Sequence, residues 1–453
     1  MKLLTHKNSS SYVSFPRRRE SRYSFTLIEL LAPKGPLRGS PRSSFTLIEL
    51  LVVLALVAIL SVVVVMTLNP AELIKQARDS NRLSDLSTIN TALNLFSADV
   101  TSGFMGTSTV VYVSIPDNAS STCGSLGLPT LPSGYTYNCV TTQNLRNTDG
   151  SGWIPVNFQR ISSNSPISQL PIDPTNTTTT RLYYTYTPGG SWELNATVEA
   201  SKNKLGGSGD LASKDGGSSP SQYEIGNNLN LSPIETGDTS LVGYWNFEEG
   251  PNATSSDKSG YGNHGTWYGT STESEHYTTG KVGSYAGYFN GGSDWISVLP
   301  SSMLLPNEIT ILVWANVAAA PGTHMGIVTN KTSTNYGINL ALNTSMNIES
   351  YISDGSSGAY LYSSLPGPTG VNVWHHVAIT HNSANTNNIY NNGSYMNNST
   401  KAIGYQTTSD RVAIGAFYSA VGSLKFNGYI DEVRIYNRVL SAAEILAIYN
   451  ATK

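Results

Sequence analysis

The chain has 453 residues, a formal net charge of −3 and only 13% charged residues. That length leaves room for two or three domains. The near-neutral charge gives no reason to expect a nucleic-acid partner, which would call for a strongly basic surface. With 41 glycines and 26 tyrosines, the composition is typical of a β-rich protein outside the cytoplasm rather than of a cytosolic enzyme.

Residues 1–44 form a basic leader, with nine Lys or Arg side chains against two Glu. Positive charge before the first apolar segment holds that end in the cytoplasm, so the rest of the chain is expected outside. The octapeptide SFTLIELL occurs at 24–31 and again at 44–51, but prolines soon follow the first copy. We interpret the first copy as a duplicated or mis-started leader rather than a second cleavage site, and we expect removal of the leader.

The longest apolar run extends from Phe45 to Leu68 and contains one charge, Glu49. As a helix it would be about 36 Å long, enough to cross a hydrocarbon layer of about 30 Å. Lipid favours the helix even across the β-branched residues Val62–Val65, because a helix satisfies its backbone amides internally. A carboxylate in such a segment is costly and marks a functional site. We therefore predict a single membrane-spanning helix with a functional Glu49.

The residues Ser44-Phe45-Thr46-Leu47-Ile48-Glu49, followed at once by this run, resemble the processing site of type IV pilins and type II secretion pseudopilins. The resemblance implies that a prepilin peptidase cleaves before Phe45 and methylates the new amine. It also implies that Glu49 pairs with the amine of a neighbouring pilin-like subunit. Such pairing is physically sound, because a buried carboxylate needs a partner and an α-amine is largely charged at neutral pH. The sequence departs from the family at Ser44, where the family has glycine.

A helix-start signature follows, with Asn69 as N-cap, Pro70 at the first position and Glu72 at the third. It predicts a kink or short break and then an amphipathic helix to about Phe96, so that residues 45–98 form a pilin-type transmembrane and amphipathic helix. The apolar stripe of this helix consists of Leu83, Leu86, Ile89, Leu93 and Phe96. Charged residues on its other faces are Arg78, Asp79, Arg82 and Asp85.

Residues 99–235 contain short β-like runs and many turns, which predict a small α/β head. The segment Leu170–Pro174 resembles a loop of major pseudopilin heads. Outside the cytoplasm, Cys123 and Cys139 are expected to form a disulfide. Two unrelated buried thiols are the alternative.

Some pseudopilin heads bind calcium in a Gly- and Asp-containing loop. Here the loop Gly206–Ser219 contains Asp210 and Asp215. Two carboxylates are few for an ion that takes six to eight oxygens, so we expect a solvated loop. Asn227–Ser240 shows no periodicity and is interpreted as a linker.

Residues 236–453 form a second module. Alternating apolar and polar residues at 309–317 and 371–379 predict strands of an antiparallel sandwich. Asn391-Asn392-Gly393 predicts a tight hairpin turn, and a capping box from Ser441 to Glu444 predicts a closing helix. The fold class is thus α+β and multidomain: a pilin-like helix with a small α/β head, followed by an antiparallel β-sandwich.

Several segments of this module resemble the laminin-G-like, concanavalin A-like jelly roll. The segments are LVGYWNFEE at 241–249, DKSGYGNHGT at 257–266, AGYFNGGSDWISV at 286–298, WHHVAIT at 374–380 and FNGYIDEVRIY at 426–436. The resemblance implies the jelly-roll fold and a glycan or protein ligand, because this fold hosts lectins, adhesion modules and enzyme accessory domains alike.

A structural calcium site is predicted at Asp257 and Asn263, joined by Asp431. Related domains often hold Ca²⁺ between this first loop and the acidic residue of the last strand, and carboxylate and carbonyl oxygens suit that ion. The alternative is that Asp257 forms an Asx-turn and Asp431 accepts a hydrogen bond.

No catalytic residues are predicted. The carboxylate-bearing E-x-D-x-E pattern of laminarinase-type enzymes is missing, and Glu248-Glu249 and Asp431-Glu432 are neighbours expected to face opposite ways. His375 and His376 are likewise adjacent, so they cannot chelate one metal. Aromatic residues that could stack on sugars are Trp267, Tyr268, Tyr360, Tyr362 and Tyr418.

We expect a non-enzymatic minor or tip subunit of a pilin-like filament that displays a binding module outside the cell. It would begin as a single-pass inner-membrane protein and reach the surface on assembly. Two alternatives remain open: an uncleaved membrane protein that tethers a lectin-like domain, which Ser44 favours, and a surface carbohydrate-active enzyme.

Overall fold

The computed structural model describes residues 46–453 apart from 133, 236, 305, 321, 331–336, 353–358, 363–370, 401–410 and 419–422. The predicted leader and the processing residues Ser44 and Phe45 therefore lie outside the described residues. The chain divides into two units, with the boundary between Thr67 and Leu68, and each is described by itself.

The first unit contains helix α1, Leu47–Leu68. Its start is a local cap: the backbone N–H and the hydroxyl of Thr46 donate to Glu49 Oε2, each at 2.9 Å. Apolar side chains stand exposed along the helix, among them Leu47 and Ile48. The helix predicted from the apolar run is present, but no helix among the described residues is both long enough and apolar enough to span a membrane.

Helix α2, Pro70–Asp99, begins as the sequence predicts and continues three residues beyond the predicted end. Asn69 takes the N-cap position in the left-handed conformation (φ 40°), and its side chain accepts the N–H of Glu72 at 3.4 Å. Pro70 occupies the first turn, where its missing N–H costs nothing. The predicted stripe is confirmed: Leu86, Ile89, Leu93 and Phe96 are buried and Leu83 is half-buried.

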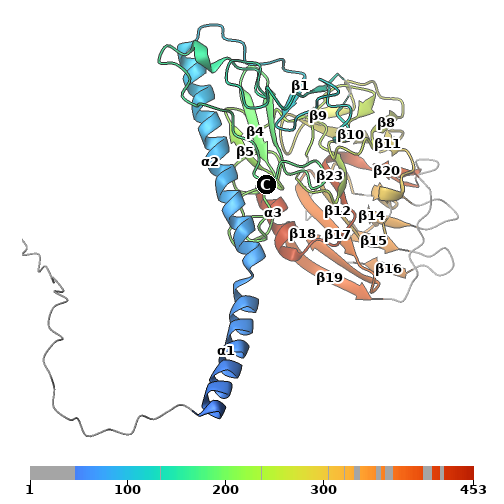
Figure 1. Cartoon of the computed structure of the whole chain (residues 1–453). Helices are drawn as coiled ribbons and strands as arrows, with labels where there is room; N and C mark the ends of the chain where they lie inside the picture. Colours follow the sequence, from blue (N-terminus) through green and yellow to red (C-terminus); the bar gives the residue numbers. More distant parts are fainter. Residues whose placement is uncertain are drawn as a thin grey trace, which may run out of the picture. The chain divides into compact units, whose positions relative to one another are not determined.

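The head contains a sheet with the strand order β2-β1-β3-β4-β5, counted over the described residues. β1 and β2 are parallel and the other pairs are antiparallel. The bounds are β1 Val110–Val113, β2 Thr136–Asn138, η1 Phe158–Arg160, β3 Tyr184–Pro188, β4 Trp192–Ala196 and β5 Tyr223–Gly226. The stripe of α2 packs in one core with aromatic residues of the head such as Trp153, Tyr184 and Tyr186. In Figure 1, α2 lies beside β4 and β5.

The second module is the predicted antiparallel β-sandwich. Within the described residues, one sheet has the order β19-β18-β17-β12-β23-β10-β9, with β6 also paired to β23. The other has the order β16-β15-β14-β13-β20-β11-β8-β7. The apolar faces of both sheets share one core, to which the alternate residues Ile309, Ile311 and Val313 belong.

The first sheet contains β6 Leu241–Trp245, β9 Tyr277–Thr279, β10 Tyr285–Asn290, β12 Ile309–Val317, β17 Trp374–His381, β18 Thr386–Asn391, β19 Ser394–Thr400 and β23 Asn427–Tyr436. The second contains β7 Thr254–Ser255, β8 Gly265–Tyr268, β11 Trp295–Val298, β13 Met325–Thr329, β14 Ile338–Leu342, β15 Ile348–Ile352, β16 Ala359–Tyr362 and β20 Val412–Ile414. The remaining elements are η2 Ser302–Leu304, β21 Ala416–Tyr418 and β22 Ser423–Lys425.

Helix α3, Ala442–Thr452, closes the chain, and its predicted capping box between Ser441 and Glu444 is confirmed. It covers part of the outer face of the first sheet, where Trp314 Nε1 donates to Thr452 Oγ1 at 2.9 Å. The predicted hairpin turn is also present, with Asn392 and Gly393 at positive φ (49° and 75°) between β18 and β19. The strand predicted from residue 371 begins only at Trp374.

Candidate functional site

A fully buried arginine fixes α2 to the head. Arg82 Nε donates to Asp173 at 2.6 Å, its Nη1 donates to Asp79 at 2.8 Å, and its Nη2 lies 2.8 Å from Glu199. Asp79 in turn accepts the backbone N–H groups of Glu199 and Ala200. The network therefore joins α2 to the segment that resembles a pseudopilin loop and to the residues that follow β4.

The sequence places Asp79 and Arg82 off the apolar stripe, which is correct, but gives no sign of their burial. Burial alone would lower the pKa of Arg82, but hydrogen bonds and charges from Asp173 and Glu199 raise it above its ordinary value. Hydrogen bonding by Arg78, and next by Arg82, lowers the pKa of Glu199 to about 2, so that this carboxylate stays ionised at physiological pH.

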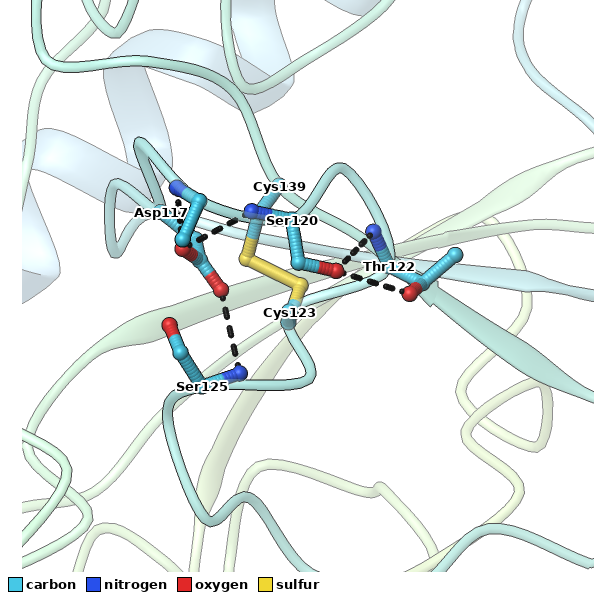
Figure 2. Close-up of a disulfide and its surroundings, with 7 residues drawn as sticks. Asp117, Ser120, Thr122, Cys123, Ser125 and Cys139 are labelled. Carbon is cyan, nitrogen blue, oxygen red and sulfur yellow. Dashed lines mark hydrogen bonds between the residues drawn. A yellow bond between two sulfur atoms is a disulfide. The ribbon is translucent and has the colours of Figure 1, made fainter.

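The predicted disulfide is confirmed. Cys123 and Cys139 are bonded, with their Cα atoms 5.3 Å apart. Figure 2 shows how Asp117 holds the adjoining turns: one carboxylate oxygen accepts the N–H of Ser120 at 3.1 Å, and the other accepts the N–H of Ser125 at 3.3 Å. Hydrogen bonds, first among them that of Ser125, hold the pKa of Asp117 below its ordinary value.

The disulfide loop docks onto the jelly roll. Thr130 donates its N–H to the carbonyl of Gly260 at 2.7 Å. Gly260 has a φ of 80°, and a Cβ added there would lie 2.5 Å from Pro129 Cβ, so this close approach requires glycine. Beside it, the Arg181 guanidinium lies 5.1 Å from the ring centroid of Tyr261. The segment DKSGYGNHG is therefore part of a junction between the head and the sandwich.

Asp257, predicted as a calcium ligand, is the centre of this segment. It is fully buried and accepts four hydrogen bonds: from the N–H of Tyr244, from the N–H and hydroxyl of Ser259, and from the N–H of Asn263, at 2.8–2.9 Å. Asn263 donates its side-chain amide to the carbonyl of Val242 at 2.7 Å. Both side chains hold the loop against β6.

Asp431, the third predicted ligand, lies under a different loop. One of its oxygens accepts the N–H groups of Lys281 and Val282 at 2.9 and 3.1 Å, and the other accepts the N–H of Glu432 at 2.8 Å. Burial, and next the Glu432 carboxylate, raises the pKa of Asp431 well above its ordinary value.

The carboxylates of Asp257 and Asp431 therefore face N–H and O–H donors of the protein, which are poor neighbours for a cation. Among the residues that the structure describes, no group of three or more His, Cys, Asp or Glu side chains could hold a metal ion. The calcium site stays a prediction, and the residues present fit it poorly.

Asp431 and Glu432 do not face opposite ways as predicted. The pairing of β12 with β23 shifts register here, because Trp314 lies opposite Asp431 whereas Leu312 lies opposite Arg434. Glu432 occupies the bulge at a positive φ of 54° and turns its carboxylate toward Arg434, 2.8 Å away. A bulge breaks the strict alternation of a strand, and nothing in the residue types marks it in advance.

A second acidic group lies on β4 and β5 of the head. Glu224 accepts the N–H of Ser219 at 2.7 Å, and Glu193 accepts the N–H of Leu231 at 2.6 Å, while the other oxygen of Glu193 is buried without a hydrogen-bond partner. Burial, and then the Glu193 charge, raises the pKa of Glu224 well above its ordinary value. Burial also raises the pKa of Asp215 to about 7.

The loop Gly206–Ser219, predicted to be solvated, is packed against the rest of the protein. Asp210 is buried and accepts the N–H of Gly206 at 2.7 Å and the hydroxyl of Ser213 at 2.7 Å. The predicted linker is packed as well, since Ile234 and Glu235 are buried.

Replacing Glu224 by glutamine should make the protein more stable at pH 8 and leave its stability near pH 4 almost unchanged. In the wild type the folded state keeps a proton that the unfolded state releases above the ordinary glutamate pKa, so stability falls as pH rises from about 4.5. Glutamine removes this dependence and can donate to the unpaired Glu193 oxygen. Thermal melts at both pH values measure the effect.

Glu199→Gln is the matched control. Because the pKa of Glu199 is lowered to about 2, its ionised form supports the fold, and its removal should destabilise the protein at neutral pH. If the Glu224→Gln protein melts below the wild type at pH 8, then burying the Glu224 carboxyl beside the Glu193 charge does not lower stability at that pH, and the prediction is wrong.

The aromatic residues proposed for sugar stacking fare differently. Trp267 is buried in the core and stacks on His276, with ring centroids 4.2 Å apart, so its prediction as a surface residue is wrong. Tyr268 is 44% exposed and stacks on Trp295. The side chains of Tyr360, Tyr362 and Tyr418 lie outside the described residues.

Two family models match the chain. The prokaryotic N-terminal methylation motif matches residues 40–65, and the concanavalin A-like lectin/glucanases superfamily matches residues 290–446. Among curated proteins, no relative matches.

Solved structures match part of the chain at low identity. The receptor-binding domain of botulinum neurotoxin C/D mosaic serotype is 15% identical, with a TM-score of 0.38 over 47% of this chain and 51% of that one. Domain 4 of AbnA, a GH43 extracellular arabinanase from Geobacillus stearothermophilus, solved with arabinotriose, is 19% identical, with a TM-score of 0.37 over 47% and 98%. The chain thus spans about half the length of the first of these structures.

The predicted resemblances are confirmed at both ends of the chain. The methylation motif covers the site that contains Ser44, Phe45 and Glu49, and the superfamily model covers most of the β-sandwich. The chain therefore joins a type IV pilin-type N-terminal methylation motif to a concanavalin A-like, laminin-G-like jelly-roll domain.

Proposed function

We propose that this chain is a minor or tip subunit of a pilin-like filament that displays its jelly roll as a binding module for glycan or protein outside the cell. The observation that carries the proposal is the methylation motif at residues 40–65, which includes most of α1, a helix whose apolar side chains are exposed. Exposed apolar surface of this extent calls for lipid or neighbouring subunits.

The proposed life cycle has two stages. The subunit first resides in the inner membrane with its C-terminal part outside, and a prepilin peptidase then removes the leader before Phe45. In the filament, the carboxylate of Glu49 pairs with the methylated amine of a neighbour, which replaces the local hydrogen bonds from Thr46. A jelly roll of this size would crowd the neighbours of a major subunit, which favours a minor or tip position.

Glu49→Ala should be processed normally but enter filaments at least tenfold less than the wild type, because the amine of the neighbouring subunit loses its counter-charge. Mass spectrometry of the N-terminal peptide reports processing, and immunoblots of sheared filaments report incorporation. The exposed Glu273, replaced by alanine, is the control and should assemble normally. Equal incorporation of Glu49→Ala and wild type would refute the proposed pairing.

The second candidate is an uncleaved membrane protein that tethers a lectin-like domain, which Ser44 favours because the pilin family has glycine before the cut. The same mass measurement separates the two: a chain that begins at methylated Phe45 supports the filament, and an intact leader supports the tether. A surface carbohydrate-active enzyme would instead show turnover in a screen of polysaccharides.

A further inference from the structure

Three aromatic side chains form a row across one end of the first sheet of the jelly roll. Tyr288 on β10 lies opposite Tyr429 on β23, with ring centroids 5.5 Å apart. The ring of Trp374 on β17 lies 6.3 Å from that of Tyr429. Asn316 on β12 is paired with both Tyr429 and Trp374, so the four residues make one continuous line across four strands. Below, "the aromatic row" means Tyr288, Tyr429 and Trp374.

The aromatic row lies on the outer face of the sheet, away from the core. Along β12 the core takes Val313, Ala315 and Val317, so Asn316 and Trp314 face outward. Helix α3 covers Trp314, but the three aromatic residues at the level of Asn316 stay partly exposed. All three side chains are half-buried, so each keeps part of its surface open to solvent.

Polar side chains accompany the row. Asn316 is 6% exposed and its carboxamide oxygen has no hydrogen-bond partner, a costly state for a buried acceptor. Asn427 lies two residues before Tyr429 on the same face and is half-buried. It is paired with Asn290 on the neighbouring strand β10. Carboxamides donate and accept hydrogen bonds at once, as neighbouring sugar hydroxyls do.

We propose that the aromatic row is a binding platform for a neutral oligosaccharide. The C–H faces of pyranose rings pack on the electron-rich faces of Tyr and Trp rings, and a row of rings fits successive sugars of a chain. The members of the row and its Asn neighbours carry no charge, which favours neutral over acidic sugars. The inference rests on the proposed role of the jelly roll as a displayed binding module, and it specifies the ligand class and the face.

The test is affinity electrophoresis of the full-length chain in detergent micelles, in gels that contain arabinan, xylan, β-glucan or galactomannan. At least one polysaccharide should retard the wild type. Trp374→Ala and Tyr429→Ala should each weaken this retardation at least tenfold, and Trp374→Phe should restore part of it, because phenylalanine keeps a stacking face. Thermal melts confirm that each variant is folded.

Trp295→Ala is the matched control, because the half-buried Trp295 stacks on the exposed Tyr268 on the other sheet. This variant should bind as the wild type does. Retardation that is lost with Trp295→Ala but kept with Trp374→Ala would overturn the aromatic row while leaving the display of a binding module intact. A wild type that none of the four polysaccharides retards would overturn the glycan assignment itself. Neither result bears on filament entry, which the Glu49 experiment measures separately.

Discussion

Arg82→Ala is expected to lower the free energy of unfolding by about 3–5 kcal/mol, the usual cost of breaking a buried ion network by removing one partner. The arginine is the cation that Asp79, Asp173 and Glu199 share, and Arg82 and both aspartates are fully buried or nearly so. Without it, the carboxylates keep their burial and lose their counter-charge. Chemical denaturation of the variant, followed by hydrogen exchange of the α2 amides, measures the loss and its place.

Arg78→Ala is the control for this prediction. Arg78 makes two hydrogen bonds to Glu199 at 2.6 and 2.8 Å, but its side chain is 31% exposed and Glu199 keeps Arg82 as a partner. Its removal should therefore cost much less stability than the removal of Arg82. Equal losses for the two variants would show that burial of Arg82 adds nothing to the network.

The local rules of chain geometry made the most successful predictions. Asn69 and Pro70 start α2 where the capping pattern indicates, and Asn392-Gly393 makes the tight turn that its residue types favour. The alternation along 309–317 likewise gives the core face of β12. Each of these patterns acts over a few neighbouring residues, so a single sequence contains all the information needed.

What the residue types do not reveal depends mainly on partners from other parts of the fold. The calcium site at Asp257 stays a prediction, but the local sequence gives no sign that its four donors would come from its own loop and from β6, or that the loop would pack on the disulfide loop. Arg82 gave no sign of burial because its partner Asp173 lies 91 residues away. A bulge at Glu432 redirected a carboxylate that simple alternation placed on the other face.

The aromatic row shows the same limit for function. Tyr288, Tyr429 and Trp374 belong to strands far apart in the chain, and nothing in their local sequences distinguishes them from ordinary strand residues with good β-propensity. Only the order β17-β12-β23-β10 brings them into one line. A sequence search for exposed aromatic residues therefore named Trp267, which the fold places in the core.

Replacing both Cys123 and Cys139 by alanine is expected to cost about 3 kcal/mol of stability, the loop-closure value for a loop of about 15 residues. The sequence separation of the two cysteines is 16. The loss should also reach the jelly roll, because the closed loop presents Pro129 and Thr130 to Gly260. Hydrogen exchange should therefore rise in residues 257–263 as well as in the disulfide loop, and dithiothreitol should produce the same change in the wild type but none in the double variant.

Gly260→Ala separates the two effects, because it keeps the disulfide and disturbs only the contact with Pro129. Its left-handed φ of 80° adds strain for any side chain. Exchange in residues 257–263 should rise in this variant while the disulfide loop, still closed, exchanges as in the wild type. If instead residues 257–263 keep wild-type protection after the disulfide is removed, the head and the jelly roll are held together by their other contacts, such as that of Arg181 with Tyr261.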